Sequence, residues 1–134
     1  MERAFRLTSY GIAAAYAYGA YVHVANMASL TGFDWPFAPL KWQVLDIVYL
    51  VLDLVVVAGV ILARRVWIIA FGIAATSQIV LYTVLRSWVL DVPAAFVVSP
   101  ESENYLTGLV AFHLVSLTIV GALLFFTKPS QRLT

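Results

Sequence analysis

The sequence predicts an all-α, polytopic integral membrane protein whose four spanning helices form one bundle with both termini in the cytoplasm. The first observation is composition: of 134 residues, 63% are hydrophobic and 11% are charged, and the mean hydropathy is +0.93. A soluble domain of this length leaves too much of its surface exposed to hide so many apolar residues, whereas a bilayer solvates them. The other two observations are the apolar stretches of spanning length and the one-sided placement of Lys and Arg.

The four predicted helices belong to one transmembrane domain, because each apolar stretch reaches the roughly 20 residues that cross the hydrocarbon core. Arg3 and Arg6 precede the first stretch. That stretch is too long for a signal-peptide core and no small-residue cleavage site follows it, so we expect a retained helix. Within the domain 1–134, the predicted helices cover about residues 7–29, 43–63, 66–90 and 105–127.

The connections between these helices differ in composition. Residues 30–42 hold two prolines and four aromatic residues, as expected of a loop at the membrane interface. Residues 63–65 form a tight basic turn. Residues 91–104 contain Pro93, Pro100 and acidic side chains, which predicts a polar loop rather than a fifth helix.

The placement of cations predicts the orientation. The positive-inside rule puts the side richer in Lys and Arg in the cytoplasm, so both termini and the turn at 63–65 lie inside, and loops 30–42 and 91–104 lie outside. Lys41 and Arg86 are the exceptions. We therefore expect an integral protein of the bacterial inner (cytoplasmic) membrane, in contact with the lipid bilayer. The cations on the inner side are Arg3, Arg6, Arg64, Arg65, Lys128 and Arg132.

Composition also excludes several classes of function. A net charge of +1 does not provide the basic face that a nucleic-acid partner requires. The absence of cysteine excludes thiol catalysis, disulfides and Cys-based metal sites. No phosphate-binding loop or nucleophile elbow occurs in the sequence, and no cofactor or metal is assigned.

Polar side chains gather in the outward half of every predicted helix, at spacings that place them on single helix faces. Gln78, Tyr82 and Arg86, for example, follow one another at four-residue intervals. A rise of about 1.5 Å per residue places Asp53 and Gln78 near the middle of the bilayer. This pattern predicts an intramembrane polar site that opens outward. The candidate catalytic residues are Asp53, His23 and His113, and the candidate ligand-binding residues are Asp46, Arg86, Gln78, Tyr82 and Asn26.

Asp53 carries most of this hypothesis. An ionised carboxylate at the bilayer centre costs about 2.5–3.5 kcal/mol even on permissive insertion scales, and intramembrane ionisable residues usually mark functional sites. We expect Asp53 to be protonated, reached by water, or paired with Arg86 or a protonated histidine. For the remaining polar residues a structural role stays open. Asp46 lies near the start of its predicted helix, where the helix dipole favours a carboxylate, and Arg86 can extend to the lipid headgroups. The other polar residues can form hydrogen bonds between helices.

Small residues form a ridge on the first predicted helix, at Gly11, Ala15 and Gly19, with His23 at the next four-residue step. Such ridges let backbones approach closely. The ridge predicts either packing inside the bundle or a contact with a second copy or a partner membrane subunit. A large side chain at Gly19 is expected to disturb assembly more than one at Gly59.

Three functions are compatible with these residues. The first is a site that binds, transports or acid/base-processes a small or amphiphilic ligand. The alternative is an accessory or structural subunit of a larger membrane complex, in which the polar layer only joins helices. A lesser alternative is a haem b electron-transfer protein with His23 and His113 as axial ligands. A metal site built from these histidines and Asp53 is compatible with the ligand types alone.

Overall fold

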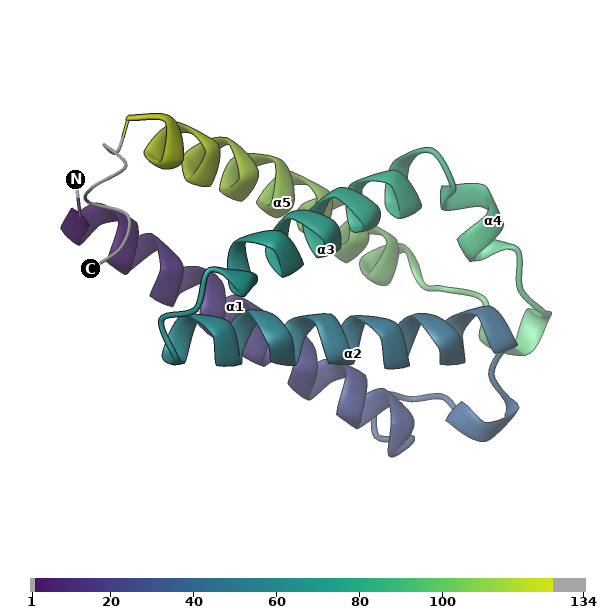
Figure 1. Cartoon of the computed structure of the whole chain (residues 1–134). Helices are drawn as coiled ribbons and strands as arrows, with labels where there is room; N and C mark the ends of the chain where they lie inside the picture. Colours follow the sequence, from purple (N-terminus) through teal and green to yellow (C-terminus); the bar gives the residue numbers. More distant parts are fainter. Residues whose placement is uncertain (1, 127–134) are drawn as a thin grey trace.

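The computed structural model describes residues 2–126, and these residues are entirely helical apart from turns and loops, with no strand (Figure 1). This confirms the all-α class. The elements in order are α1 (Glu2–Met27), η1 (Trp35–Phe37), α2 (Leu40–Ile61), α3 (Val66–Thr83), α4 (Arg86–Leu90), η2 (Ala94–Phe96) and α5 (Pro100–Phe126), where η denotes a single 3₁₀ turn.

Three of these helices, α2, α3 and α5, are long and apolar enough to cross a membrane. Length and composition therefore support a membrane protein with transmembrane helices. The helix α1 is as long as the others, with 26 residues, but it is less apolar. Its tyrosines, together with His23 and Asn26, lower its hydropathy.

The long helices pack in chain order: α1 mainly on α2, α2 also on α3, and α3 also on α5, whereas α1 and α5 share little contact. The chain start and the α2–α3 turn lie at one end of the molecule, and η1, α4 and η2 lie at the other (Figure 1). An apolar core occupies the first of these ends. Its most buried members include Ile12, Val56, Phe71, Ala74 and Ala75.

The third predicted helix is not continuous. It ends at Thr83, the chain turns, and a short helix begins at Arg86, so the expectation of one helix over 66–90 is wrong. Two contacts accompany the break: the Thr83 hydroxyl donates to the Ile79 carbonyl at 2.6 Å, and the Leu85 amide donates five residues back to the Val80 carbonyl at 3.0 Å. Such side-chain and end-of-helix bonds compete with continuation of the helical ladder.

The last helix begins earlier than predicted, at Pro100, so the polar loop ends at Ser99. Proline suits the first helical position because its missing N–H would have no partner there. The Ser99 hydroxyl accepts a hydrogen bond from the Ser102 amide at 3.3 Å, and Glu101 lies in the first turn, where the helix dipole favours a carboxylate.

The small-residue ridge of α1 does not pack uniformly. A Cβ atom on Gly11 would meet no atom within 4 Å, whereas one on Gly19 would lie 2.5 Å from Asp53 Oδ2. A Cβ atom on Gly59 would lie 2.8 Å from Trp67 Cβ and 3.0 Å from its backbone nitrogen. A backbone contact yields less easily than the end of a side chain. The expected order of Gly19 and Gly59 is therefore not supported, because only at Gly59 would the Cβ press on the backbone of a neighbouring helix.

We predict that Gly59→Ala lowers the free energy of unfolding by about 1–3 kcal/mol, because the new methyl group forces α2 and α3 apart. Gly72→Ala is the matched control, since its Cβ would enter open space. That substitution should be neutral or slightly stabilising, because alanine favours the helix. Thermal unfolding in detergent measures both variants, and equal melting temperatures would contradict the close contact.

Candidate functional site

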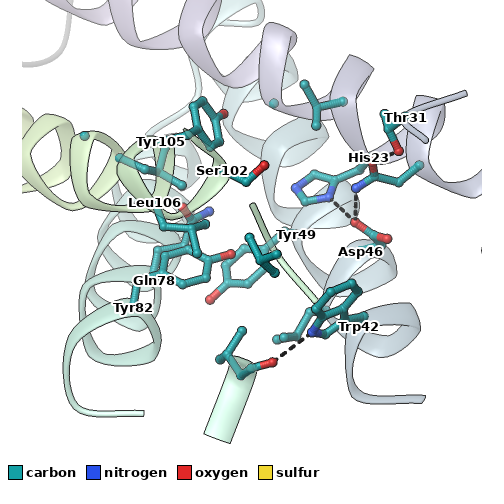
Figure 2. Close-up of a pocket in the computed structure, with 18 of the residues that line it drawn as sticks. His23, Thr31, Trp42, Asp46, Tyr49, Gln78, Tyr82, Ser102, Tyr105 and Leu106 are labelled. Atoms are coloured by element: carbon teal, nitrogen blue, oxygen red, sulfur yellow. Dashed lines mark hydrogen bonds and ion pairs between the residues drawn. The ribbon is translucent and has the colours of Figure 1, made fainter. Parts of the chain in front are cut away.

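A cavity of about 890 Å³ lies between α1, α2, α3 and α5, in the end of the molecule opposite the chain start. Figure 2 shows His23 and Asp46 on one side of it, Gln78 and Tyr82 on the other, and Tyr49 between them. Polar groups are few and the wall is largely aromatic and aliphatic, as is usual for ligand cavities. The cavity brings together most of the residues singled out from the sequence, namely His23, Asn26, Asp46, Asp53, Gln78, Tyr82 and His113.

Arg86 is the exception. Its guanidinium donates to Glu103 Oε2 at 3.1 Å, to the Glu103 carbonyl at 3.1 Å and to the Thr107 hydroxyl at 3.2 Å. The break after Thr83 removes Arg86 from the helix face that carries Gln78. The expectation that Arg86 pairs with Asp53 is therefore not met, and Arg86 does not line the cavity as a ligand-binding residue would.

Asp46 is the acceptor on which the polar contacts of the cavity converge. Its carboxylate accepts hydrogen bonds from His23 Nδ1 at 2.8 Å, Asn26 Nδ2 at 2.9 Å and Trp35 Nε1 at 2.9 Å. Asn26 and Trp35 can only donate through these nitrogens. An ionised carboxylate accepts from all three, so His23 also donates, and Asp46 fixes the proton on its Nδ1.

Further contacts hold the three donors in place. The Thr31 hydroxyl donates to Asn26 Oδ1 at 2.7 Å, which turns the amide nitrogen toward Asp46. Gln43 Nε2 donates to the carbonyls of Ala38 at 2.9 Å and Trp35 at 3.2 Å, and so ties the η1 segment to α2.

The imidazole of His23 stacks on the Tyr49 ring, with centroids 6.2 Å apart and planes inclined by 17°. The Tyr49 hydroxyl in turn donates to Ser77 Oγ at 3.0 Å, which links the stack to α3. The orientation of His23 is therefore set by α1, α2 and α3 together.

Asp53 lies on the other side of the His23 ring. His23 Nε2 is 3.9 Å from Asp53 Oδ2, and Asp53 is only 3% exposed. Because Nδ1 donates to Asp46, Nε2 is the ring nitrogen that is left to face Asp53. The separation of 3.9 Å is longer than a hydrogen bond and makes an ion pair when His23 is protonated. Asp46, His23 and Asp53 thus form a carboxyl–imidazole–carboxyl row, in which a histidine lies within ion-pair distance of Asp53.

Gly19 makes room for this row. Its missing side chain leaves the space that Asp53 Oδ2 occupies, 2.5 Å from where a Cβ would stand. The glycine was singled out as part of a packing ridge, and its position four residues before His23 was the signal for this second role.

The cavity also contains polar atoms that lack a partner within residues 2–126. The amide oxygen of Gln78 and the hydroxyl of Tyr16 are buried and form no hydrogen bond. His113 places its Nδ1 2.8 Å from the Leu109 carbonyl, to which it donates, and this leaves Nε2 as an acceptor. Native structures rarely leave buried polar groups unpaired. These atoms are therefore candidates for ligand contacts.

An aromatic cluster lines the cavity at the loop end. Phe33 lies 5.8 Å from Trp42 between ring centroids, and Phe96 lies 6.3 Å from each, all in edge-to-face arrangements. The Trp42 indole donates to the Val89 carbonyl at 3.0 Å, which joins the cluster to α4 (Figure 2).

The cavity reaches the surface on the side of α1 and α5. None of its lining residues on α2 or α3 is exposed, whereas Tyr18 is 60% exposed and Tyr105 is 51% exposed. Gly108, also in the lining, has open space where a side chain would stand. Exposed lining residues therefore lie on α1 and α5, which share little contact, and also in the loops, where Val97 is 70% exposed.

Sequence reasoning missed Trp35, the third donor to Asp46. The loop that carries it was interpreted as an interfacial belt, and nothing in its composition distinguishes Trp35 from the other aromatic residues there. Trp35 reaches Asp46 only because the η1 segment folds back over α2.

No group of three or more His, Cys, Asp or Glu side chains within residues 2–126 is arranged to hold a metal ion, which leaves the metal-site alternative without support there. The chain matches no protein-family model, no curated protein and no solved structure in the comparisons made.

Proposed function

We propose that the chain is a membrane protein whose cavity takes up an amphiphilic ligand from the bilayer and exchanges a proton with it. The observation that carries this proposal is the cavity itself, of about 890 Å³, with the Asp46–His23–Asp53 row on its wall. Cavities of roughly 300–1,000 Å³ with apolar walls and a few fixed polar groups are typical ligand sites.

The opening between α1 and α5 supports access from the side. A ligand with an apolar body dissolves in the bilayer and meets the exposed rings of Tyr18 and Tyr105 at the opening. Its polar group then reaches the row, which is a more favourable partner for it than hydrocarbon or the aromatic wall. Access through the loop end is less favourable, because the rings of Phe33, Trp42 and Phe96 pack together there.

The row supplies the chemistry. Asp46 holds His23 in one tautomer and orientation, as a carboxylate partner does for catalytic histidines. Nε2 and Asp53 then give a proton to the ligand or take one from it. Binding, transport and acid/base processing all use this exchange, so the reaction type depends on the ligand.

Within the membrane we propose a four-helix bundle in which α1 spans together with α2, α3 and α5, in the bacterial inner membrane with both termini in the cytoplasm. The support is that Arg64 and Arg65, exposed in the α2–α3 turn, lie at the same end as the chain start, which carries Arg3 and Arg6 (Figure 1). The cavity is at the opposite end. Lys128 and Arg132 lie outside the described residues.

We expect a cysteine in place of Ala94 to react with a membrane-impermeant thiol reagent applied to intact cells, and one in place of Ser130 to react only after lysis. The chain has no cysteine of its own, so background labelling is absent. The positive-inside rule is the reason for this expectation. Labelling of Ser130→Cys in intact cells would overturn the orientation.

The outer surface of α1 is a candidate contact for another protein. Gly11 faces open space, so part of the ridge of Gly11, Ala15 and Gly19 is available for a second copy or a partner subunit. This contact stays a prediction.

The haem alternative is weakened, because no Lys or Arg within residues 2–126 lines the cavity to meet the propionates.

Gly108→Phe tests the proposed function. The new side chain would start from open space in the cavity lining, since nothing lies within 4 Å of a Cβ at this position. Gly121→Phe is the matched control on the same helix, with equally open space but outside the cavity lining. The probes are 1-aminomethylpyrene and 1-pyrenemethanol, added to the protein in phosphatidylcholine nanodiscs, with energy transfer from tryptophan to pyrene as the signal.

We predict that Gly108→Phe slows association of the bound probe by at least about tenfold, whereas Gly121→Phe leaves it unchanged, because steric blocking of an access path acts on the association rate. Equal rates in the two variants would contradict access between α1 and α5. If neither probe binds above the level of empty nanodiscs, the proposed function is wrong and the accessory-subunit alternative replaces it.

A further inference from the structure

We infer that the ligand of this cavity is an amphiphilic organic cation that carries at least one N–H, such as a primary or secondary ammonium on an apolar body. The inference rests on the proposed function and names its ligand class. It follows from the charge of the cavity, from the acceptors left open in it and from the character of its walls.

The charge of the cavity is negative. Asp46 and Asp53 line it, and no Lys or Arg within the described part of the chain does. The two cations nearest to this end of the molecule are engaged elsewhere: the Lys41 ammonium donates to the carbonyls of Trp88 and Asp91, and Arg86 pairs with Glu103. The row holds two carboxyl groups and one imidazole, so its acidic groups outnumber its basic ones. A buried charge without a partner is costly, so a cationic ligand is stabilising.

The open acceptors indicate an N–H donor. Gln78 and Tyr16 are 6% and 4% exposed and line the cavity, and the amide oxygen and the hydroxyl have no hydrogen-bond partner within residues 2–126. Asp53 has one ion-pair contact among the described residues, at 3.9 Å. An ammonium group with several N–H bonds can donate to Asp53 and to Gln78 together. A quaternary ammonium cannot, and an anion would meet carboxylate and amide oxygens.

The walls suit the remainder of such a molecule. Aromatic ring faces attract cations and also accept apolar surface, so one wall serves both parts of an amphiphilic cation. Tyr49 already stacks on His23 beside the row. The aromatic residues of the lining are Tyr16, Tyr18, Phe33, Trp42, Tyr49, Tyr82, Phe96, Tyr105 and Phe112.

A pair of probes with the same ring system tests the inference. 1-Aminomethylpyrene is a primary ammonium at neutral pH, and 1-pyrenemethanol is its uncharged counterpart. Both are titrated into the full-length protein in phosphatidylcholine nanodiscs, with empty nanodiscs as the partition control. We expect the wild-type protein to bind the ammonium at least about tenfold more tightly than the alcohol, since a buried charge pair contributes that much or more.

Asp53→Asn should abolish this preference, because asparagine keeps the shape of the side chain and removes its charge. Asp34→Asn is the matched control: it removes the same charge from an exposed loop position at the same end of the molecule. The control should keep the preference, which separates a site effect from general attraction to a negative surface.

The outcomes separate the two proposals. If ammonium and alcohol bind the wild-type protein equally, the cation inference is wrong and the proposed function stands. If neither binds above empty nanodiscs, both are wrong. The wild-type comparison needs no variant, so the inference stays testable even if Asp53→Asn fails to fold. A preference that survives in folded Asp53→Asn, or that is lost in Asp34→Asn, would also overturn the assignment.

Discussion

The three hydrogen bonds that converge on Asp46 are the constraint on which the rest of the site depends. They join α2 to α1 through His23 and Asn26, and to the η1 segment through Trp35, at distances of 2.8–2.9 Å. Hydrogen bonds to a charged group contribute more than those between neutral partners, about 1.5–3 kcal/mol each. Without this acceptor, three partly buried donors from two separate segments would lose their partner at once.

The cavity follows from this constraint. With Nδ1 committed to Asp46, His23 can face Asp53 only through Nε2, and Gly19 leaves the space in which the Asp53 carboxyl lies. The other end of the molecule differs, because its apolar core around Val56 and Phe71 packs the helices closely. The helices therefore pack closely at one end and enclose, at the other, a largely apolar cavity with a few polar groups.

The sequence predicted the features that depend on neighbouring residues of one helix, and it missed those that depend on contacts between distant segments. Helical periodicity and hydropathy were sufficient for the helices and for gathering His23, Asp53 and Gln78 around one cavity, because these are local properties of each helix. The break after Thr83 was missed, since apolar residues continue on both sides of it, and Arg86 was misplaced as a result. The role of Trp35 was missed because it depends on a loop folding back over α2, which no local pattern records.

The protonation of His23 tests the central claim most directly. The chain has two histidines, so ¹⁵N-histidine labelling in nanodiscs gives two ring systems, and His113→Gln assigns them. Our account predicts that His23 carries its proton on Nδ1, with a proton resonance shifted downfield by the carboxylate, and that Asp46→Asn moves this resonance while leaving His113 unchanged. The account would be contradicted by a neutral His23 that is protonated on Nε2 and unprotonated on Nδ1, or by a His23 resonance that does not shift in Asp46→Asn.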